Sequence, residues 1–256
     1  MEVKTLTDLR KLIITASSLA HEGHVPSAFS ILEILYVIYV VIPAKHKSVT
    51  LKDFDFILSK GHGSLALYAA LTASGHIDES WVQDFCKDQS NFGGHPDRNK
   101  VSGVVASTGS LGHGLPITIG RILANRQKNL KQRSFCLVGD GELNEGSCWE
   151  SLMLAENFKL NELCLIVDNN ISTTRAVTTF NLEEKFKSFG FQVFVIDGHD
   201  LIELEKTLTM PISQNPVAVI ANTTKGKGLR DMENSFEWHH RSPNKNELSI
   251  FLEELK

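Results

Sequence analysis

The sequence predicts an α/β fold: a doubly wound, mainly parallel sheet with helices on both faces. Apolar, strand-like runs alternate with helix-like segments along most of the chain, and such alternation is typical of doubly wound sheets. The strand-like runs are continuously apolar, as expected for parallel strands that are covered on both faces. With 256 residues, 42% of them hydrophobic, the chain is long enough for one large core. We therefore expect a single domain over residues 1–256.

The first 42 residues show helical periodicity, with a break at "EGHVPS" between two helices. Ser27 and Ser30 are candidate caps for the second helix, and we expect this helix to end at Pro43. The stretch 28–42 is apolar, but it is short for a membrane span and carries Glu33. It therefore indicates a buried helix rather than a membrane segment.

The middle of the chain begins with a short predicted strand, "DFDFILS" at 53–59. A glycine-rich turn, "KGHG", then leads into a helix that we expect to end at Gly75. The polar, glycine-bearing stretch 85–110 follows. Loops of this length inside a compact domain are usually functional, so this one is a candidate part of a site.

From residue 111 the alternation becomes regular. We expect helices at 111–130, 145–160, 182–190 and 200–210, and strands at 134–140, 162–170, 191–198 and 217–224. Ligands of doubly wound folds bind beyond the carboxyl ends of the strands. Polar residues stand at these ends: Asp140, Asp168–Asn170, Asp197–His199 and Thr223–Lys225.

Charge and cysteine usage exclude several classes of partner. The net charge is −4 and the basic residues are scattered, so nothing indicates nucleic acid. The N-terminus has no signal-peptide pattern, and we expect no membrane association. The four cysteines form no CxxC pair, so we expect reduced thiols and a cytoplasmic protein.

The strongest chemical motif is Gly139-Asp140-Gly141 at the end of an apolar run. The glycines let a bulky ligand come close to the backbone, and a following helix N-terminus offers N–H groups to an anion. Asp140 would repel a phosphate unless a cation lay between them, and Mg²⁺ fits that role. A simple turn or helix cap is the alternative.

The end of the next predicted strand favours the metal interpretation. Asn170 follows Asp140 by thirty residues, after "LIVD". Because adjacent parallel strands end side by side, a carboxylate and an amide oxygen can share one cation. This pairing resembles the diphosphate motif of thiamine-diphosphate enzymes.

Five motifs narrow the resemblance. In order they are "EGHVPSAFSILEILYVIY", "LSKGHGSLALYAAL", "FGGHPDRNKVSGVVASTGSLGHGLPITIGRILA", "GDGELNEGSCWESLMLAENFKLNELCLIVDNN" and "TTKGKGLRDMENSFEWHH". Together they span roughly residues 5–245, and they are similar to the N-terminal, diphosphate-binding half of transketolases. The resemblance implies the thiamine-diphosphate-binding fold and the cofactors thiamine diphosphate and Mg²⁺.

The resemblance also assigns residues to roles. Asp140, Asn170 and the main-chain oxygen of Ser172 would hold Mg²⁺. Gly139, Gly141, Gly109, Ser110 and Leu111 would line the cofactor. Lys225 is a possible phosphate contact or a residue of a solvated loop, and Glu145 matches an acid that connects two active sites across a subunit interface.

Four histidines lie in the matched motifs: His24, His62, His95 and His239. The resemblance places His62 and His239 near the cofactor, and His24 and His95 beside the donor sugar. An imidazole that titrates near neutrality suits the proton exchanges of such chemistry. His46 and His76 are expected on the surface, and His199 is expected to be structural.

Two departures concern the substrate. Transketolases usually have Gly-His-Pro-Gly where this chain has "GHVPS", and Trp-His-Gly where it has "WHH". The additional ring of His240 and the altered residues after His24 leave the identity of the sugar open.

The resemblance further implies a partner. The glutamate that activates thiamine diphosphate belongs to a pyrimidine-binding domain, for which this sequence has no counterpart. We therefore expect a split transketolase, in which this chain and a C-terminal subunit form an α2β2 complex. It would transfer a two-carbon ketol unit from a ketose, usually phosphorylated, to an aldose.

Other functions stay open at this point. A deoxyxylulose-phosphate synthase-like enzyme shares part of the motifs but not the histidine pattern. A non-catalytic, cofactor-binding half is a second alternative. A metal-dependent hydrolase is a third, although no HxH or HExxH spacing occurs.

Overall fold

The computed structural model describes residues 4–46, 54–172, 177 and 181–256. Within this part, one five-stranded sheet has the order β1-β2-β3-β5-β4, and every neighbouring pair is parallel. The strands are β1 (Phe54–Leu58), β2 (Arg133–Gly139), β3 (Leu163–Asn169), β4 (Gln192–Asp197) and β5 (Val217–Asn222). The predicted parallel sheet and all of its predicted strands are confirmed.

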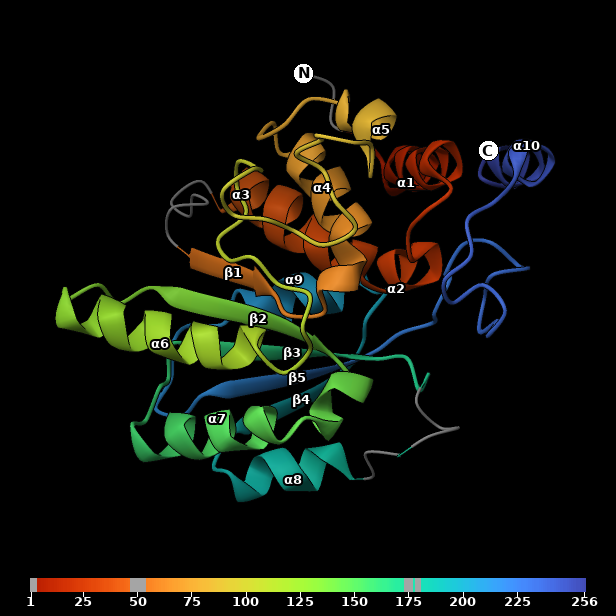
Figure 1. Cartoon of the computed structure of the whole chain (residues 1–256). Helices are drawn as coiled ribbons and strands as arrows, with labels where there is room; N and C mark the ends of the chain where they lie inside the picture. Colours follow the sequence, from red (N-terminus) through yellow and green to blue (C-terminus); the bar gives the residue numbers. More distant parts are fainter. Residues whose placement is uncertain (1–3, 47–53, 173–176, 178–180) are drawn as a thin grey trace.

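Helices cover both faces of the sheet, as Figure 1 shows. One face packs against α6 (Gly114–Gln127), α7 (Gly146–Asn157) and α8 (Leu182–Ser188), and the other is covered by α2 (Val25–Tyr36), α4 (Ser64–Ala73) and α9 (Leu201–Leu208). On that side α1 (Leu6–Ala20) packs against α2 and α4 rather than on the strands. Alternate strand residues serve the two layers: Leu137 belongs to the α1–α2–α4 core, and Val138 to the α6–α7 core. The doubly wound architecture is therefore confirmed.

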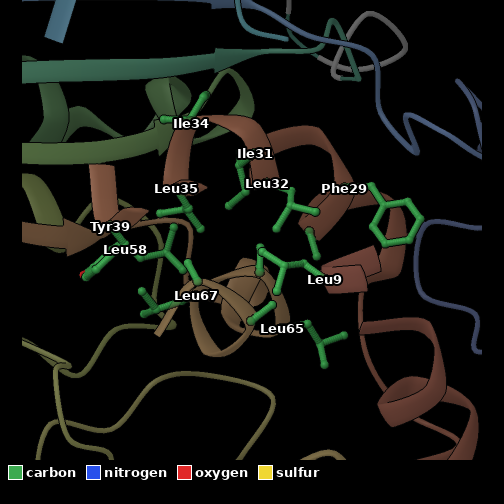
Figure 2. Close-up of a cluster of buried hydrophobic side chains, with 14 of the residues drawn as sticks. Leu9, Phe29, Ile31, Leu32, Ile34, Leu35, Tyr39, Leu58, Leu65 and Leu67 are labelled. Atoms are coloured by element: carbon green, nitrogen blue, oxygen red, sulfur yellow. The ribbon is translucent and has the colours of Figure 1, made fainter. Parts of the chain in front are cut away.

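The larger core lies between α1, α2, α4 and the sheet. Figure 2 shows part of it, where Leu9 of α1, Leu32 of α2 and Leu65 of α4 meet. All three side chains are almost completely buried. This packing fixes α2 above the sheet, and α2 in turn carries polar residues toward the strand ends.

The strand order places a topological switch next to β3. The chain moves outward from β2 through β3 to β4, with α7 and α8 on one face, and returns through α9 on the other face to insert β5. Right-handed crossovers require this change of face when the direction reverses. The carboxyl ends of β2, β3 and β5 therefore lie together at the position where such folds bind ligands.

Two expectations about the second helix are wrong. Its N-cap is His24 and Pro26 lies in its first turn, so Ser27 and Ser30 are interior residues rather than caps. The helical run also passes Pro43: a π-helical turn, Val37–Val41, leads into α3 (Ile42–Lys45). Pro43 occupies the first turn of α3, where a missing N–H needs no partner.

The remaining helices differ from expectation in smaller ways. The helix after "KGHG" is a 3₁₀ turn, Gly61–Gly63, followed by α4, which ends at Ala73 rather than Gly75. Two helices without a prediction are α5 (Trp81–Asp84) and α10 (Lys245–Glu254). The run Val25–Lys45 has the length and hydropathy of a membrane span, but 89% of its most apolar window is buried. It is the predicted buried helix.

Candidate active site

A cavity of about 540 Å³ lies beyond the carboxyl ends of β1, β2, β3 and β5. Its volume is in the usual range for small-molecule sites. It is lined by His24, Ser27, Lys60, His62, His95, Gly109, Leu111, Gly139, Asp140, Gly141, Glu142, Asn170, Ser172, Lys225, His239 and His240. Most of the residues predicted for the site are therefore brought together in one cavity.

Asp140 directly follows β2 and begins a 3₁₀ turn, Gly141–Asn144. One carboxylate oxygen accepts the N–H of Gly141 at 2.8 Å. The other, Oδ2, is buried and has no hydrogen-bond partner among the described residues. Burial, followed by the nearby charge of Asp168, raises the pKa of Asp140. An unpartnered, buried carboxylate oxygen is unfavourable by itself, and a cation is the ligand that would satisfy it.

Asp168, at the end of β3, is the opposite case. It is fully buried and accepts hydrogen bonds from Ser30 Oγ at 2.6 Å and Asn170 Nδ2 at 2.9 Å. Thr223 Oγ1 also donates to it, and Lys60 forms a buried ion pair with it. Asp168 therefore supports the architecture of the site rather than a ligand.

Asn170 is oriented by this network. Its amide nitrogen donates to Asp168 and, at 3.0 Å, to Ser30 Oγ. The side-chain oxygen of Asn170 accepts a hydrogen bond from the backbone N–H of Ser172 at 3.1 Å. Since both donors of the amide are used by buried partners, the oxygen is the atom that remains for a cation. The predicted adjacency of Asp140 and Asn170 is confirmed by the pairing of their strands, Gly139 with Asp168.

The histidines form a cluster at the other side of the cavity. The ring of His24 lies 5.3 Å from that of His62, 5.6 Å from that of His239 and 4.4 Å from that of His240. Burial, together with neighbouring histidines, lowers the pKa of His24 to about 4. Burial and the charge of Lys60 lower the pKa of His62 to about 2. Both rings are therefore neutral at physiological pH and are weak bases, so the expectation of imidazoles that titrate near neutrality does not hold for His24 and His62.

His95 lines the same cavity but is exposed. It packs against Gly109, where a Cβ atom would lie 3.2 Å from the imidazole ring. Glycine at this position therefore lets the loop that carries His95 close onto the strand ends.

Lys225 is a buried cation of the cavity. Its Nζ lies 2.6 Å from Nδ1 of His239. Burial, followed by the charge of Lys60, lowers its pKa to about 8, and burial also lowers the pKa of His239. Lys225 has no carboxylate partner in an ion pair among the described residues, so its charge is available to an anion. Of the two sequence interpretations, the phosphate contact is favoured over the solvated loop.

Two predicted site residues do not line the cavity. Ser110 and Glu145 are both exposed, and Glu145 stands just before α7 without a side-chain capping bond. Their roles stay predictions. His46 and His76, expected on the surface, are partly buried instead.

Several residues of the site had no predicted site role: Ser27, Ser30, Lys60 and Glu142. Asp168 and Thr223 were expected only as polar residues at strand ends, and His240 only as a departure that bears on the sugar. Glu142 illustrates the type: its carboxylate accepts the N–H of Gly112 at 2.9 Å and of Gly139 at 3.2 Å, and so joins two loops of the cavity. The strand-end positions of Asp168 and Thr223 and the additional ring of His240 are sequence signals, but nothing in "VDNN" separates the role of Asp168 from that of its neighbours.

One face of α2 supplies much of the site. Ser27 lines the cavity, Ser30 contacts Asp168, and Glu33 contacts His199 at 3.1 Å. These residues are three apart, so they lie along one side of the helix. His199 Nε2 accepts the N–H of Thr224 at 2.8 Å, next to Lys225. This hydrogen bond agrees with the structural role expected of His199.

The donor set fits Mg²⁺. Among the described residues, no three or more His, Cys, Asp or Glu side chains form a cluster suited to a metal. A site of one carboxylate, one amide oxygen and a main-chain oxygen matches the oxygen ligands that Mg²⁺ prefers, alongside phosphate. The unpartnered oxygen of Asp140 is the observation in this structure that supports the fit.

Comparison with known proteins identifies the family. Residues 1–252 match the family model described as transketolase, thiamine diphosphate binding domain. The chain belongs to the transketolase family. The resemblance to transketolases is thereby confirmed, and the deoxyxylulose-phosphate synthase alternative is not favoured.

Two relatives are similar in length as well as in sequence, and both are named as one subunit of an apulose-4-phosphate transketolase. The relative from Actinobacillus succinogenes is 36% identical over all of this chain and 96% of its own length. The relative from Phocaeicola vulgatus is 32% identical over 95% of this chain and 91% of its own. This transketolase-family chain is therefore a transferase subunit of the transketolase type.

Transketolases that combine all domains in one chain are matched only in part. The crystal structure of Campylobacter jejuni transketolase superposes with a TM-score of 0.85 and 27% identity, over 100% of this chain and 43% of that one. Human transketolase is 32% identical over 98% of this chain and 41% of its own length. The chain thus spans less than half the length of these transketolases.

Proposed function

We propose that this chain is the Mg²⁺- and diphosphate-binding subunit of a split transketolase, and that residues 1–256 form its one domain. The observation that carries the proposal is the buried, unpartnered oxygen of Asp140, at the end of the strand next to the one that leads to Asn170. In this proposal Asp140, Asn170 and the main chain at Ser172 hold Mg²⁺. Lys225 and His239 contact the diphosphate, and Gly139 and Gly141 leave room for it.

Thiamine diphosphate supplies the electron sink for cleavage of the carbon–carbon bond beside the ketose carbonyl. The chain's own residues then have three tasks. Asp140 would bind Mg²⁺, and Lys225 would bind and orient the diphosphate. His24 and His95 hydrogen-bond the sugar hydroxyls. His62 and His239, whose lowered pKa values keep them neutral, hydrogen-bond the reacting groups through their ring nitrogens. The products are the carbonyl compound left when the donor loses two carbons, which is an aldose from an unbranched ketose and a ketone from a donor branched at C3, and an acceptor extended by two carbons.

A partner subunit completes the active site in this proposal. The names of both similar-length relatives describe a subunit rather than a whole enzyme, and the chain covers less than half of the single-chain transketolases. Ile171 and Phe236 are 61% and 64% exposed beside a second hollow at the cavity edge. Exposed apolar residues next to a site are typical of an interface. We propose an α2β2 complex in the cytoplasm, consistent with the four free cysteines.

The substrates we propose are a short ketose phosphate as donor and an aldose phosphate as acceptor. Apulose 4-phosphate is the first donor to test, because the names of two relatives include it.

Isothermal titration calorimetry tests the proposal. Thiamine diphosphate, with and without Mg²⁺, is titrated into the complex with the co-expressed C-terminal subunit. We expect Mg²⁺-dependent binding, weakened by ~100-fold or more in Asp140→Ala, since even indirect supports of a metal site are worth ~10–100-fold. Asp197→Ala, at the end of β4 and outside the cavity, is the matched control and should bind normally. Absence of binding, or unchanged affinity in Asp140→Ala, would overturn the proposal.

A further inference from the structure

His240 stands at the rim of the cavity. The side chain of His240 is 55% exposed, whereas Lys225 is buried. His239 and His240 are both exposed, whereas His24 and His62 are half-buried. His240 packs against His24 at 4.4 Å, and His24 lies 5.3 Å from His62. His240 therefore lies on the exposed side of the histidine cluster, together with His239.

Glu22 holds the ring of His240 in place. Glu22 Oε1 lies 2.8 Å from His240 Nε2 and also accepts the N–H of Gly23 at 3.1 Å. Burial opposes ionisation of Glu22, but the hydrogen bonds from His240 and Gly23 outweigh it and lower the pKa of the carboxyl. Because the carboxylate is anchored to the backbone, the His240 ring has a fixed orientation rather than a freely rotating one.

The position of His240 matters for the path that a donor sugar would take through the cavity. The Mg²⁺ and diphosphate groups belong to the strand ends, at Asp140, Asn170 and Lys225. If the ketol end of the ketose lies beside His62, the rest of the donor extends outward past His24. Its phosphate-bearing end then arrives at His240, so the fixed ring limits how long that end can be.

We propose that the pair His240–Glu22 is a specificity wall that selects short ketose phosphates as donors. His240 is the residue that the donor touches, and Glu22 positions it. This inference rests on the proposed function, which it deepens by naming what selects the donor. It also gives a role to the additional ring in "WHH", which the family resemblance marked as a departure.

The test is a panel of donors of increasing length, given to the complex with its co-expressed partner. Apulose 4-phosphate, xylulose 5-phosphate, fructose 6-phosphate and sedoheptulose 7-phosphate carry the phosphate on successively more distant carbons. We expect the wild type to prefer the shorter donors. His240→Gly should raise kcat/KM for the longest donor relative to the shortest by ~10-fold or more, the scale of one misfitting group in a pocket.

A double-mutant cycle separates the wall from a general structural effect. Glu22→Ala should relax the length preference less than His240→Gly, and should add nothing to it in the double variant, because Glu22 acts through the ring. His240→Phe keeps a ring at the rim but loses the hydrogen bond to Glu22, so it should retain about as much of the preference as Glu22→Ala does. It also provides a variant that tests the wall if His240→Gly is not obtained folded. His21→Gly removes an exposed imidazole outside the cavity and is the control without effect.

The outcomes distinguish the two proposals. If the wild-type complex turns over none of the four donors although it binds cofactor, the proposed function fails. If the wild type is active and the length preference is the same in His240→Gly, or is lost in His240→Phe, the specificity wall is wrong and the proposed function stands. Calorimetry with thiamine diphosphate should give equal affinity for every variant, since His240 lies away from the diphosphate groups.

Discussion

The ends of β2 and β3 lie side by side, and each carries one buried aspartate, yet the two carboxylates are used in opposite ways. Asp168 receives four donors from the protein itself, including the ammonium of Lys60. Asp140 receives one, and its second oxygen has no partner among the described residues. The cations differ in the same way: Lys60 is paired with Asp168, while Lys225 contacts only His239 in the interactions described. A polar cluster at a strand edge thus separates into groups that stabilise the fold and groups that are left for a ligand.

The largest effect is expected on the structural side of this comparison. Asp168→Ala leaves Lys60 as an uncompensated buried cation and also removes the acceptor of Ser30 and Thr223. Breaking one partner of a buried pair typically costs ~3–5 kcal/mol. Urea denaturation of the isolated chain should therefore show a loss of that size in the free energy of unfolding.

A double variant sharpens the result. Replacing both partners, Asp168→Leu with Lys60→Met, should recover most of the lost stability, because buried pairs exchanged for apolar residues are often neutral. If Asp168→Ala were as stable as the wild type, the assignment of Asp168 to the scaffold would be wrong.

The next effect concerns the free cation. Lys225→Met should weaken binding of thiamine diphosphate by roughly 10- to 100-fold, since hydrogen bonds to charged groups contribute ~1.5–3 kcal/mol. The stability of the unliganded chain should hardly change or should rise, because the variant no longer buries a charge. Lys227→Met, in the same loop but outside the cavity, is the matched control. Calorimetry measures the affinity and thermal melting measures the stability. If Lys225 were a solvated loop residue, Lys225→Met and Lys227→Met would lose affinity for thiamine diphosphate equally.

The smallest effect is the dependence of stability on pH that Asp140 produces. Folding raises its pKa above the ordinary value of 3.8, through burial and the charge of Asp168. The folded state then binds the proton of Asp140 more tightly than the unfolded state does. The resulting contribution of Asp140 to the free energy of unfolding is therefore fully present below pH 3.8 and is lost as pH rises through the raised pKa.

Asp140→Asn isolates this contribution. Without ligands, the variant should gain stability relative to the wild type as the pH rises from below 3.8 toward neutrality. With Mg²⁺ and thiamine diphosphate the order should reverse, because only the wild type has the carboxylate ligand. Denaturation at several pH values measures the difference, and a constant difference at every pH would show that the carboxylate is satisfied within the protein.

Much of this site was predictable because its parts follow directly from local sequence. The glycines around Asp140, the thirty-residue spacing to Asn170 and the four histidines in polar loops all carry chemistry in the residue type itself. Continuous apolar strands then predicted a parallel sheet, which brings the strand ends together. The missed residues depend on long-range contacts: Ser30 sits in an apolar helix and contacts Asp168 across 138 positions of sequence.

The errors in helix boundaries have a similar cause. Pro26 and Pro43 indicate interruptions when the sequence is taken alone, but both occupy first turns of helices, where proline is tolerated. The π-helical turn before Pro43 has no distinctive composition, since "VIYVV" also suits an ordinary helix or a strand. The rim position of His240 likewise depends on how residues 223–240 fold back over the cavity, which no local pattern specifies.

The three-residue spacing on α2 has a consequence for the insertions and deletions that the chain can accept. His24, Ser27, Ser30 and Glu33 keep one side of the helix toward the strand ends, while Phe29 and Leu32 fill the core. One additional residue inside this segment would rotate everything on one side of it by about 100°. Serine and glutamate would then point into the apolar layer, and phenylalanine or leucine toward the cavity. We therefore expect α2 to tolerate no insertion or deletion between His24 and Glu33.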